Sequence, residues 1–186
     1  TPVSLSFFLL TSCGFVWQIG TAMVLLSNTS EAAVTWCRLT YIGAILIPVA
    51  TYHFIIAFVN KEGHQQYIRV SYFIGLFLFY PLSQTALFLD GINKYPWGYW
   101  FKAGILHPFF ILFLFGLMLI SFVNLFSAYK RERNPLQKMR LKFLFVAFLI
   151  AYIGIVDFPA DYGVKLYPFG YLPLMMYVSL MAYAIV

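Results

Sequence analysis

Charged side chains are scarce in this chain. Asp, Glu, Lys and Arg make up 10% of its 186 residues, whereas 62% are hydrophobic and the mean hydropathy is +0.84. Soluble domains carry roughly 25% charged residues. This scarcity excludes a water-soluble fold and predicts an all-α, polytopic bundle of transmembrane helices. Membrane-spanning strands are excluded as well, because the apolar runs are long and do not alternate with polar residues.

Cysteine and histidine are also rare. The two cysteines, Cys13 and Cys37, lie on different predicted helices, which excludes a disulfide framework and a cysteine metal site. His53 and His107 are expected at depths that differ by roughly 20 Å, at ~1.5 Å of rise per helical residue. His64 lies in a predicted loop. We therefore expect no metal and no other cofactor.

Catalytic patterns are missing too. No Ser-His-Asp order, glycine-rich phosphate loop or HExxH sequence is present. No acid or base lies near the centre of a predicted span, where a charge costs ~2.5–3.5 kcal/mol and is usually retained for function. The last span has no lysine, which excludes the retinal attachment of seven-helix photoreceptors. We expect this segment to have no enzymatic activity.

Long apolar runs fill most of the chain. A helix needs about 20 mainly apolar residues to cross the hydrocarbon core of a bilayer. Six stretches meet this requirement and predict one membrane domain over residues 1–186. Their approximate bounds are Val3–Leu26, Thr35–Phe58, Val70–Leu89, Ala103–Ser127, Leu141–Val156 and Tyr167–Val186.

Several local signals refine these spans. Asn28 and Glu31 resemble a capping box at the start of the second helix. Pro81 is expected to interrupt the third helix. The segment Asp90–Trp100 is rich in Trp and Tyr, which favour the headgroup layer, so we expect a loop on the membrane surface. The first turns of the sixth span contain Gly170 and prolines, which predict an irregular outer end.

The second span has a patterned face. Five of its residues recur at intervals of three and four, and residues with this spacing share one side of a helix. We expect this side to face the bundle. The residues are Arg38, Tyr41, Ile45, Pro48 and Tyr52.

A basic loop, Tyr129–Lys142, separates the fourth and fifth spans. It contains six of the twelve Lys and Arg residues and a single acid, Glu132. Such a cluster between apolar runs marks a cytoplasmic loop, and Asn134-Pro135 is expected to end the preceding helix. The basic residues are Lys130, Arg131, Arg133, Lys138, Arg140 and Lys142.

Counting from this loop predicts the side of every other segment. Both chain ends and the linker Asn60–Arg69 are then cytoplasmic. Inner loops carry eight basic residues against two acids, and outer segments carry four of each. The positive-inside rule thus accounts for the whole net charge of +6. Nucleic-acid binding is not needed to explain it, and the expected surroundings are a bilayer with anionic lipid near the basic loop.

Polar residues gather at the predicted outer end of the bundle, with several tryptophans nearby. One interpretation is a pocket for a small-molecule or lipid signal. The other treats the same residues as interfacial caps and ion pairs, for instance Arg38 with Asp157. The candidate ligand-binding residues are Arg38, Trp97, Trp100, His107, Asp157 and Asp161.

Three stretches carry a resemblance to a known family. They are Trp36–Gly43 (WCRLTYIG) followed by Pro48 and Tyr52-His53-Phe54, Tyr167–Gly170 (YPFG), and Ala182–Val186 (AYAIV). Together with Trp17 they resemble the N-terminal seven-helix region of bacterial sensor histidine kinases, over nearly the whole chain. The resemblance implies a sensory input module in the bacterial inner membrane. It also implies one further helix before Thr1, a homodimer, and a histidine kinase or similar output domain after the last helix.

The sequence therefore predicts the membrane sensor region of a bacterial signalling receptor, six of seven helices, passing a signal to a cytoplasmic output domain. The alternative is a small-solute transporter. Inverted repeats and broken helices would favour transport, but only the proline kinks support it.

Overall fold

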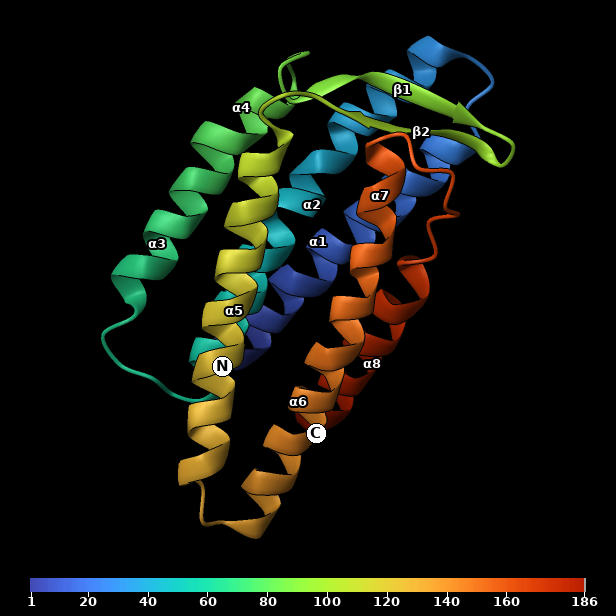
Figure 1. Ribbon diagram of the computed structural model, residues 1–186. Helices are drawn as coiled ribbons and strands as arrows, with labels where there is room; N and C mark the ends of the chain where they lie inside the picture. The colour runs from blue at the N-terminus through green and yellow to red at the C-terminus, as the bar shows by residue number, and fades with distance from the viewer. Residues whose placement is uncertain (186) are drawn as a thin grey trace.

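The computed structural model describes residues 1–185. Val186 lies outside the described residues. The sixth predicted span ends at this residue, and the output domain is expected to follow it. The described part is mostly helical, with one two-stranded sheet (Figure 1). Its elements in order are α1 Pro2–Leu25, α2 Ser30–Phe58, α3 Gln65–Phe73, η1 Ile74–Phe79, α4 Tyr80–Ser83, β1 Leu89–Tyr95, β2 Gly98–Ala103, α5 His107–Arg131, α6 Pro135–Ile153, η2 Gly154–Asp157, α7 Phe158–Asp161 and α8 Tyr171–Ile185.

Four helical stretches are long and apolar enough to cross a membrane. They are α1, α2, α5 and the continuous α6–η2–α7 stretch, Pro135–Asp161. Helix α8 is apolar but has only 15 residues, which gives roughly 22 Å at 1.5 Å per residue, less than the hydrocarbon core. In place of the third predicted span, Val70–Leu89, the chain has the helical stretch α3–η1–α4, which begins with polar residues at Gln65 and ends at Ser83. The count of six spans therefore remains a prediction.

The ends of two helices show how the sequence sets their boundaries. Thr29, not Asn28, caps α2, because its hydroxyl accepts a hydrogen bond from the Ala32 amide at 3.3 Å. Asn134 caps α6 by accepting from the amides of Leu136 and Gln137, and Pro135 occupies the first turn. The predicted break at Asn134-Pro135 is confirmed.

The interruption predicted at Pro81 is confirmed and takes the form of a π-helix. Residues Ile74–Phe79 form a wide turn immediately before Tyr80-Pro81. A proline ring clashes with the carbonyl four residues earlier, here Phe77, and cannot donate to it. A wider turn with i→i+5 hydrogen bonds moves that carbonyl away and keeps the helix continuous.

A β-hairpin corrects the all-α prediction. Strands β1 and β2 pair antiparallel, with Asn93 opposite Trp100 and Tyr95 opposite Gly98. The segment expected as a surface loop is therefore strand over most of its length, and α5 starts at His107, not at Ala103. Gly98 has φ +130°, which suits the tight turn. Figure 1 shows the hairpin lying across one end of the bundle.

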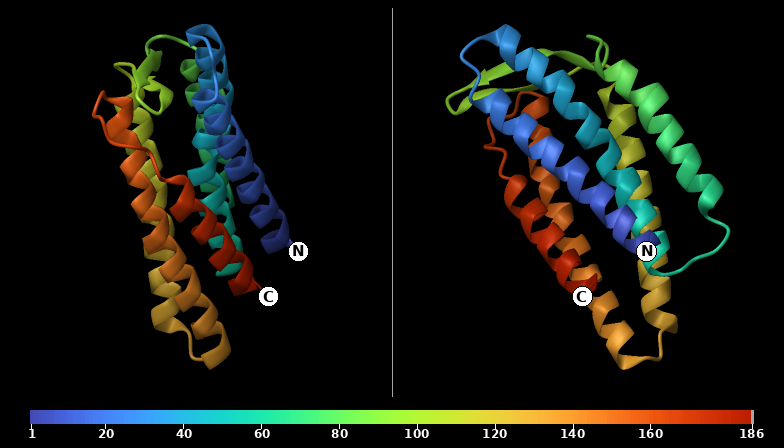
Figure 2. Two further views of the ribbon diagram at one scale, coloured as in Figure 1. Left: turned by 90° about the vertical axis from the view of Figure 1, so that its right-hand side faces the viewer. Right: turned by 180° about the vertical axis from the view of Figure 1, so that it is seen from behind.

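Below the hairpin, the helices pack against one another along their length. The most extensive contact joins α1 and α2, and α8 packs mainly on α6 (Figure 2). Gly43 permits the α1–α2 approach, because a Cβ there would lie 2.6 Å from the Cys13 carbonyl oxygen. The patterned face of α2 is confirmed as the inner face: four of its five residues are buried, and Arg38 is half-buried.

The two ends of the bundle differ in what they carry. The hairpin, the α1–α2 turn and the 162–170 segment lie at one end, which we call the hairpin end (Figure 1). The α2–α3 and α5–α6 connections lie at the opposite, basic-loop end. Figures 1 and 2 place both marked ends of the chain in the half of the bundle away from the hairpin. This arrangement agrees with the sidedness predicted from the charges.

Candidate functional site

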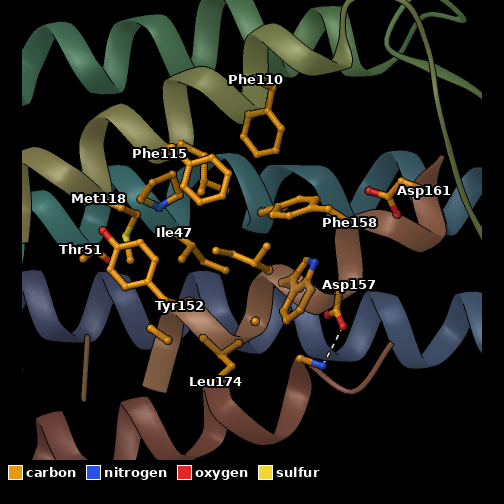
Figure 3. A pocket seen from close by; sticks show the side chains of 18 of the residues that line it. Ile47, Thr51, Phe110, Phe115, Met118, Tyr152, Asp157, Phe158, Asp161 and Leu174 are labelled. Carbon is orange, nitrogen blue, oxygen red and sulfur yellow. Dashed lines mark hydrogen bonds between the residues drawn. The ribbon is translucent and has the colours of Figure 1, made fainter. Parts of the chain in front are cut away.

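A cavity of about 140 Å³ lies inside the bundle below the hairpin. Its walls come from α1, α2, β2, α5, the α6–η2–α7 stretch and α8, together with the segment before α8. Most of the lining is aromatic or aliphatic, as in Phe110, Phe115 and Leu174 (Figure 3). Small-molecule sites in proteins are usually concave, apolar and supplied with a few placed polar groups.

Hydroxyl groups lie at the end of the cavity farther from the hairpin. Thr51 of α2 and Tyr177 of α8 are both buried, and their hydroxyls are 3.1 Å apart in a hydrogen bond. Figure 3 shows Thr51, Met118 and Tyr152 together at this end. This hydrogen bond satisfies both hydroxyl groups and connects α8 to α2.

The opposite end of the cavity carries carboxyl groups. Asp161 is 5% exposed, and its Oδ1 accepts a hydrogen bond from Trp100 Nε1 at 2.8 Å. Its Oδ2 lies 3.9 Å from His107 Nε2. The sequence-predicted residues Trp100, His107 and Asp161 therefore come together, from β2, α5 and α7.

His107 is fully buried and uses both ring nitrogens. Nε2 is 2.8 Å from the Tyr41 hydroxyl, and Nδ1 is 2.9 Å from the Tyr162 hydroxyl. A neutral imidazole has one N–H, so one nitrogen donates and the other accepts. Burial, reinforced by the nearby Asp161 charge, raises the pKa of Tyr162. Its hydroxyl thus stays protonated and available as a donor.

Asp157 connects the cavity to the start of α8. It is 7% exposed, and its Oδ1 accepts a hydrogen bond from the Gly170 amide at 2.7 Å. A side chain at position 170 would collide with this carboxyl group. A residue larger than glycine would have to displace the carboxyl group. Asp157 thus ties the α6–η2–α7 stretch to the residues that lead into α8 (Figure 3).

Three of the six predicted residues are not part of the cavity lining: Arg38, Trp97 and His107. Trp97 stacks on Tyr95, with ring centroids 4.7 Å apart, and meets Tyr167 edge-on. The predicted pair of Arg38 with Asp157 is wrong: Arg38 Nε is buried and has no hydrogen-bond partner in the described chain. The α2 turn that carries Arg38 is instead connected to Gln84, whose amide donates to the Arg38 carbonyl at 3.2 Å.

Sequence reasoning missed three residues of the site. Tyr41 was expected to face the bundle, and this position could have suggested a contact with His107. Tyr162 and Gly170 gave no comparable signal, because both lie in an irregular segment whose path depends on tertiary contacts. Each missed residue hydrogen-bonds to a predicted one: Tyr41 and Tyr162 to His107, and Gly170 to Asp157.

The remaining histidines lie outside this cluster. His53 Nδ1 is 3.3 Å from the Tyr72 hydroxyl, and His64 Nδ1 is 2.6 Å from the Tyr52 hydroxyl. Over residues 1–185, no group of three or more His, Cys, Asp or Glu side chains is placed to hold a metal ion.

Comparison with known proteins gives one match. The family described as the N-terminal 7TM region of histidine kinase matches residues 1–186. Searches of curated proteins and of solved structures return no match. The family match covers every element described above and agrees with the apolar helices of a multi-pass membrane protein. The chain belongs to the family of N-terminal seven-transmembrane regions of histidine kinases.

Proposed function

We propose that this segment is a single, non-catalytic sensory domain whose cavity receives the signal and whose last helix passes it to a cytoplasmic output domain. Membership of a histidine kinase input family supports the role. The observation that carries the proposal is the position of α8: Leu174 and Tyr177 form part of the cavity wall.

The proposed coupling runs through two contacts of α8. The Gly170 amide near its start is bonded to Asp157, and the Tyr177 hydroxyl in its middle is bonded to Thr51. An occupant that separates or draws together these walls changes how α8 packs on α6. A ligand shifts such an equilibrium only by its differential affinity for the two packings.

The proposed orientation follows from charge. In the described chain α8 runs from the hairpin end toward the basic-loop end (Figure 1). Tyr129–Lys142, predicted as a loop, is mostly the end of α5 and the start of α6, and five of its six basic residues lie on these helices. Such a basic cluster at a helix connection favours the cytoplasm. The hairpin would then face the outside of a bacterial inner membrane, and the chain after α8 would enter the cytoplasm to reach a histidine kinase or similar domain. The family membership also favours a homodimer as the working unit.

The test fills the cavity without touching its polar groups. Ala44 lines the cavity from α2, and Ala44→Leu adds three carbons to that wall. Ala22 of α1 is exposed on the outside of the bundle, so Ala22→Leu makes the same change facing lipid. Both variants are introduced into the full-length receptor in lipid nanodiscs, and histidine autophosphorylation is measured. Thermal unfolding of each variant confirms folding.

We expect Ala44→Leu to change the phosphorylation rate about tenfold, since ~1.4 kcal/mol on a two-state equilibrium is a factor of ten. Ala22→Leu should match the parent. A folded Ala44→Leu receptor with the parent's phosphorylation rate would contradict the proposal. Solute uptake into vesicles without any change in phosphorylation would support a transporter instead.

A further inference from the structure

The carboxyl groups at the hairpin end of the cavity have no Lys or Arg partner among residues 1–185. Ion pairs in the described chain are Lys102 with Asp90 and the 3.9 Å approach of His107 to Asp161. Neither Lys nor Arg pairs with Asp157 or Asp161. These two residues are four apart on the continuous α6–η2–α7 stretch, and residues at this spacing share one side of a helix. Figure 3 shows both at the same end of the cavity.

Each carboxyl group has one oxygen that accepts no hydrogen bond, although Oδ2 of Asp161 lies 3.9 Å from His107 Nε2. The hydrogen bonds from Gly170 and Trp100 both go to Oδ1. No hydrogen bond reaches Oδ2 of Asp157 or Oδ2 of Asp161 within the described chain, although both side chains are more than nine-tenths buried and line the cavity. A buried carboxylate with an open acceptor is unfavourable unless it is paired or protonated.

The rest of the lining suits the body of an organic cation. Aromatic rings of Trp100, Tyr41 and Phe158 border the carboxyl end, and the faces of such rings attract ammonium groups. The volume of about 140 Å³ is close to that of the ~150 Å³ engineered apolar cavity that binds benzene. An anion would meet two carboxyl groups and would be repelled.

We propose that the cavity binds a small primary ammonium ion with an apolar body about the size of one benzene ring. The ammonium group lies between Asp157 and Asp161, where it donates to their free oxygens, and the body extends toward Thr51. This assignment rests on the proposed sensory function and names the chemistry of its signal. In this assignment the ammonium group binds beside the Asp157–Gly170 hydrogen bond, which holds the start of α8.

The experiment compares three probes of similar shape and different charge: benzylamine, benzyl alcohol and benzoate. Their affinities are measured by calorimetry on the protein in nanodiscs, with empty nanodiscs subtracting the uptake by lipid. A hydrogen-bonded charge pair typically gives about tenfold or more in affinity. We expect benzylamine to bind about tenfold more tightly than benzyl alcohol, and benzoate to show no binding to the protein.

Isosteric variants locate the charge selectivity. Asp157→Asn and Asp161→Asn keep an oxygen for the Gly170 and Trp100 donors, so each should retain the fold while weakening benzylamine about tenfold. Benzyl alcohol should bind them as it binds the parent. Asp90→Asn is the matched control, because Asp90 is half-exposed on the hairpin and pairs with Lys102.

The outcomes separate this assignment from the sensory proposal. Equal affinities for benzylamine and benzyl alcohol in the parent protein would overturn the cation assignment, as expected if the acids are simply protonated. This comparison needs no variant and so does not depend on folding. Absence of binding by all three probes would also overturn it, while a changed phosphorylation rate in Ala44→Leu would leave the sensory role standing.

Discussion

Polar residues differ in burial and in the range of their contacts between the two ends of the bundle. At the hairpin end, His107, Asp161 and Trp100 are buried: Trp100 donates to Asp161, and His107 lies 3.9 Å from the same carboxyl group, from elements far apart in the sequence. At the opposite end, the residues of the basic loop itself make local, exposed contacts: Asn134 caps its own helix, and Lys138 lies 5.2 Å from the centre of the Tyr129 ring. The hairpin end therefore has a buried polar interior, whereas the basic-loop end is distinguished by its positive charge.

The largest expected effect concerns the orientation that this charge imposes. Alkaline phosphatase, which is active only in the periplasm, is fused after residue 186. The parent fusion should be inactive, because the basic loop keeps this end inside. Replacing the six basic residues of the loop by Gln should yield an active fraction, whereas replacing Lys94, Lys102 and Lys165 should not. An active parent fusion would reverse the proposed topology and remove the path to a cytoplasmic output.

The next largest effect compares the buried His107 network with a single part-buried hydrogen bond of His64. His107→Leu leaves the Tyr41 and Tyr162 hydroxyls without their shared partner, and we expect a loss of about 2–4 kcal/mol in the free energy of unfolding. His64→Leu, the same change at the basic-loop end, removes one bond from a half-exposed ring and should cost about 1 kcal/mol or less. Chemical denaturation in detergent micelles measures both. Equal losses would contradict the contrast between the two ends.

The smallest effect concerns Gly170. A Cβ there would collide with the Asp157 carboxyl group, so Gly170→Ala should destabilise the fold by about 1–3 kcal/mol. Gly116 of α5 provides the control, because its Cβ would meet nothing within 4 Å. Gly116→Ala should stabilise by about 0.5–1 kcal/mol, as expected in a helix interior. Thermal unfolding of the two proteins compares them, and a neutral Gly170→Ala would show that the Asp157 contact is not tight.

Features that depend on local chemistry could be predicted from the sequence. The Asn134-Pro135 break, the interruption at Pro81 and the buried face of α2 follow from capping, proline geometry and helical period. The family resemblance, based on short stretches such as Trp36–Gly43, is confirmed over the whole chain. These signals act within a few residues or along one helix, so no tertiary information is needed to interpret them.

Features that depend on tertiary contacts were missed. Aromatic residues in Asp90–Trp100 suit a membrane interface and a strand equally, so composition alone did not reveal the hairpin. Trp100 and Trp97 are close in sequence, yet one donates to Asp161 and the other stacks on Tyr95. The pairing of Asp157 with Gly170, and not with Arg38, is set by how the 162–170 segment folds back before α8.

The wide turn before Pro81 has a geometric consequence for the whole third helical stretch. From Ser71 onward its buried residues fall every fourth position, at Ser71, Gly75, Phe79 and Ser83. With 3.6 residues per turn, each step of four would rotate the contact line by about 40° around the axis. A turn that holds more residues cancels part of this rotation. One straight seam can therefore follow α2 without the supercoil that regular helices would need.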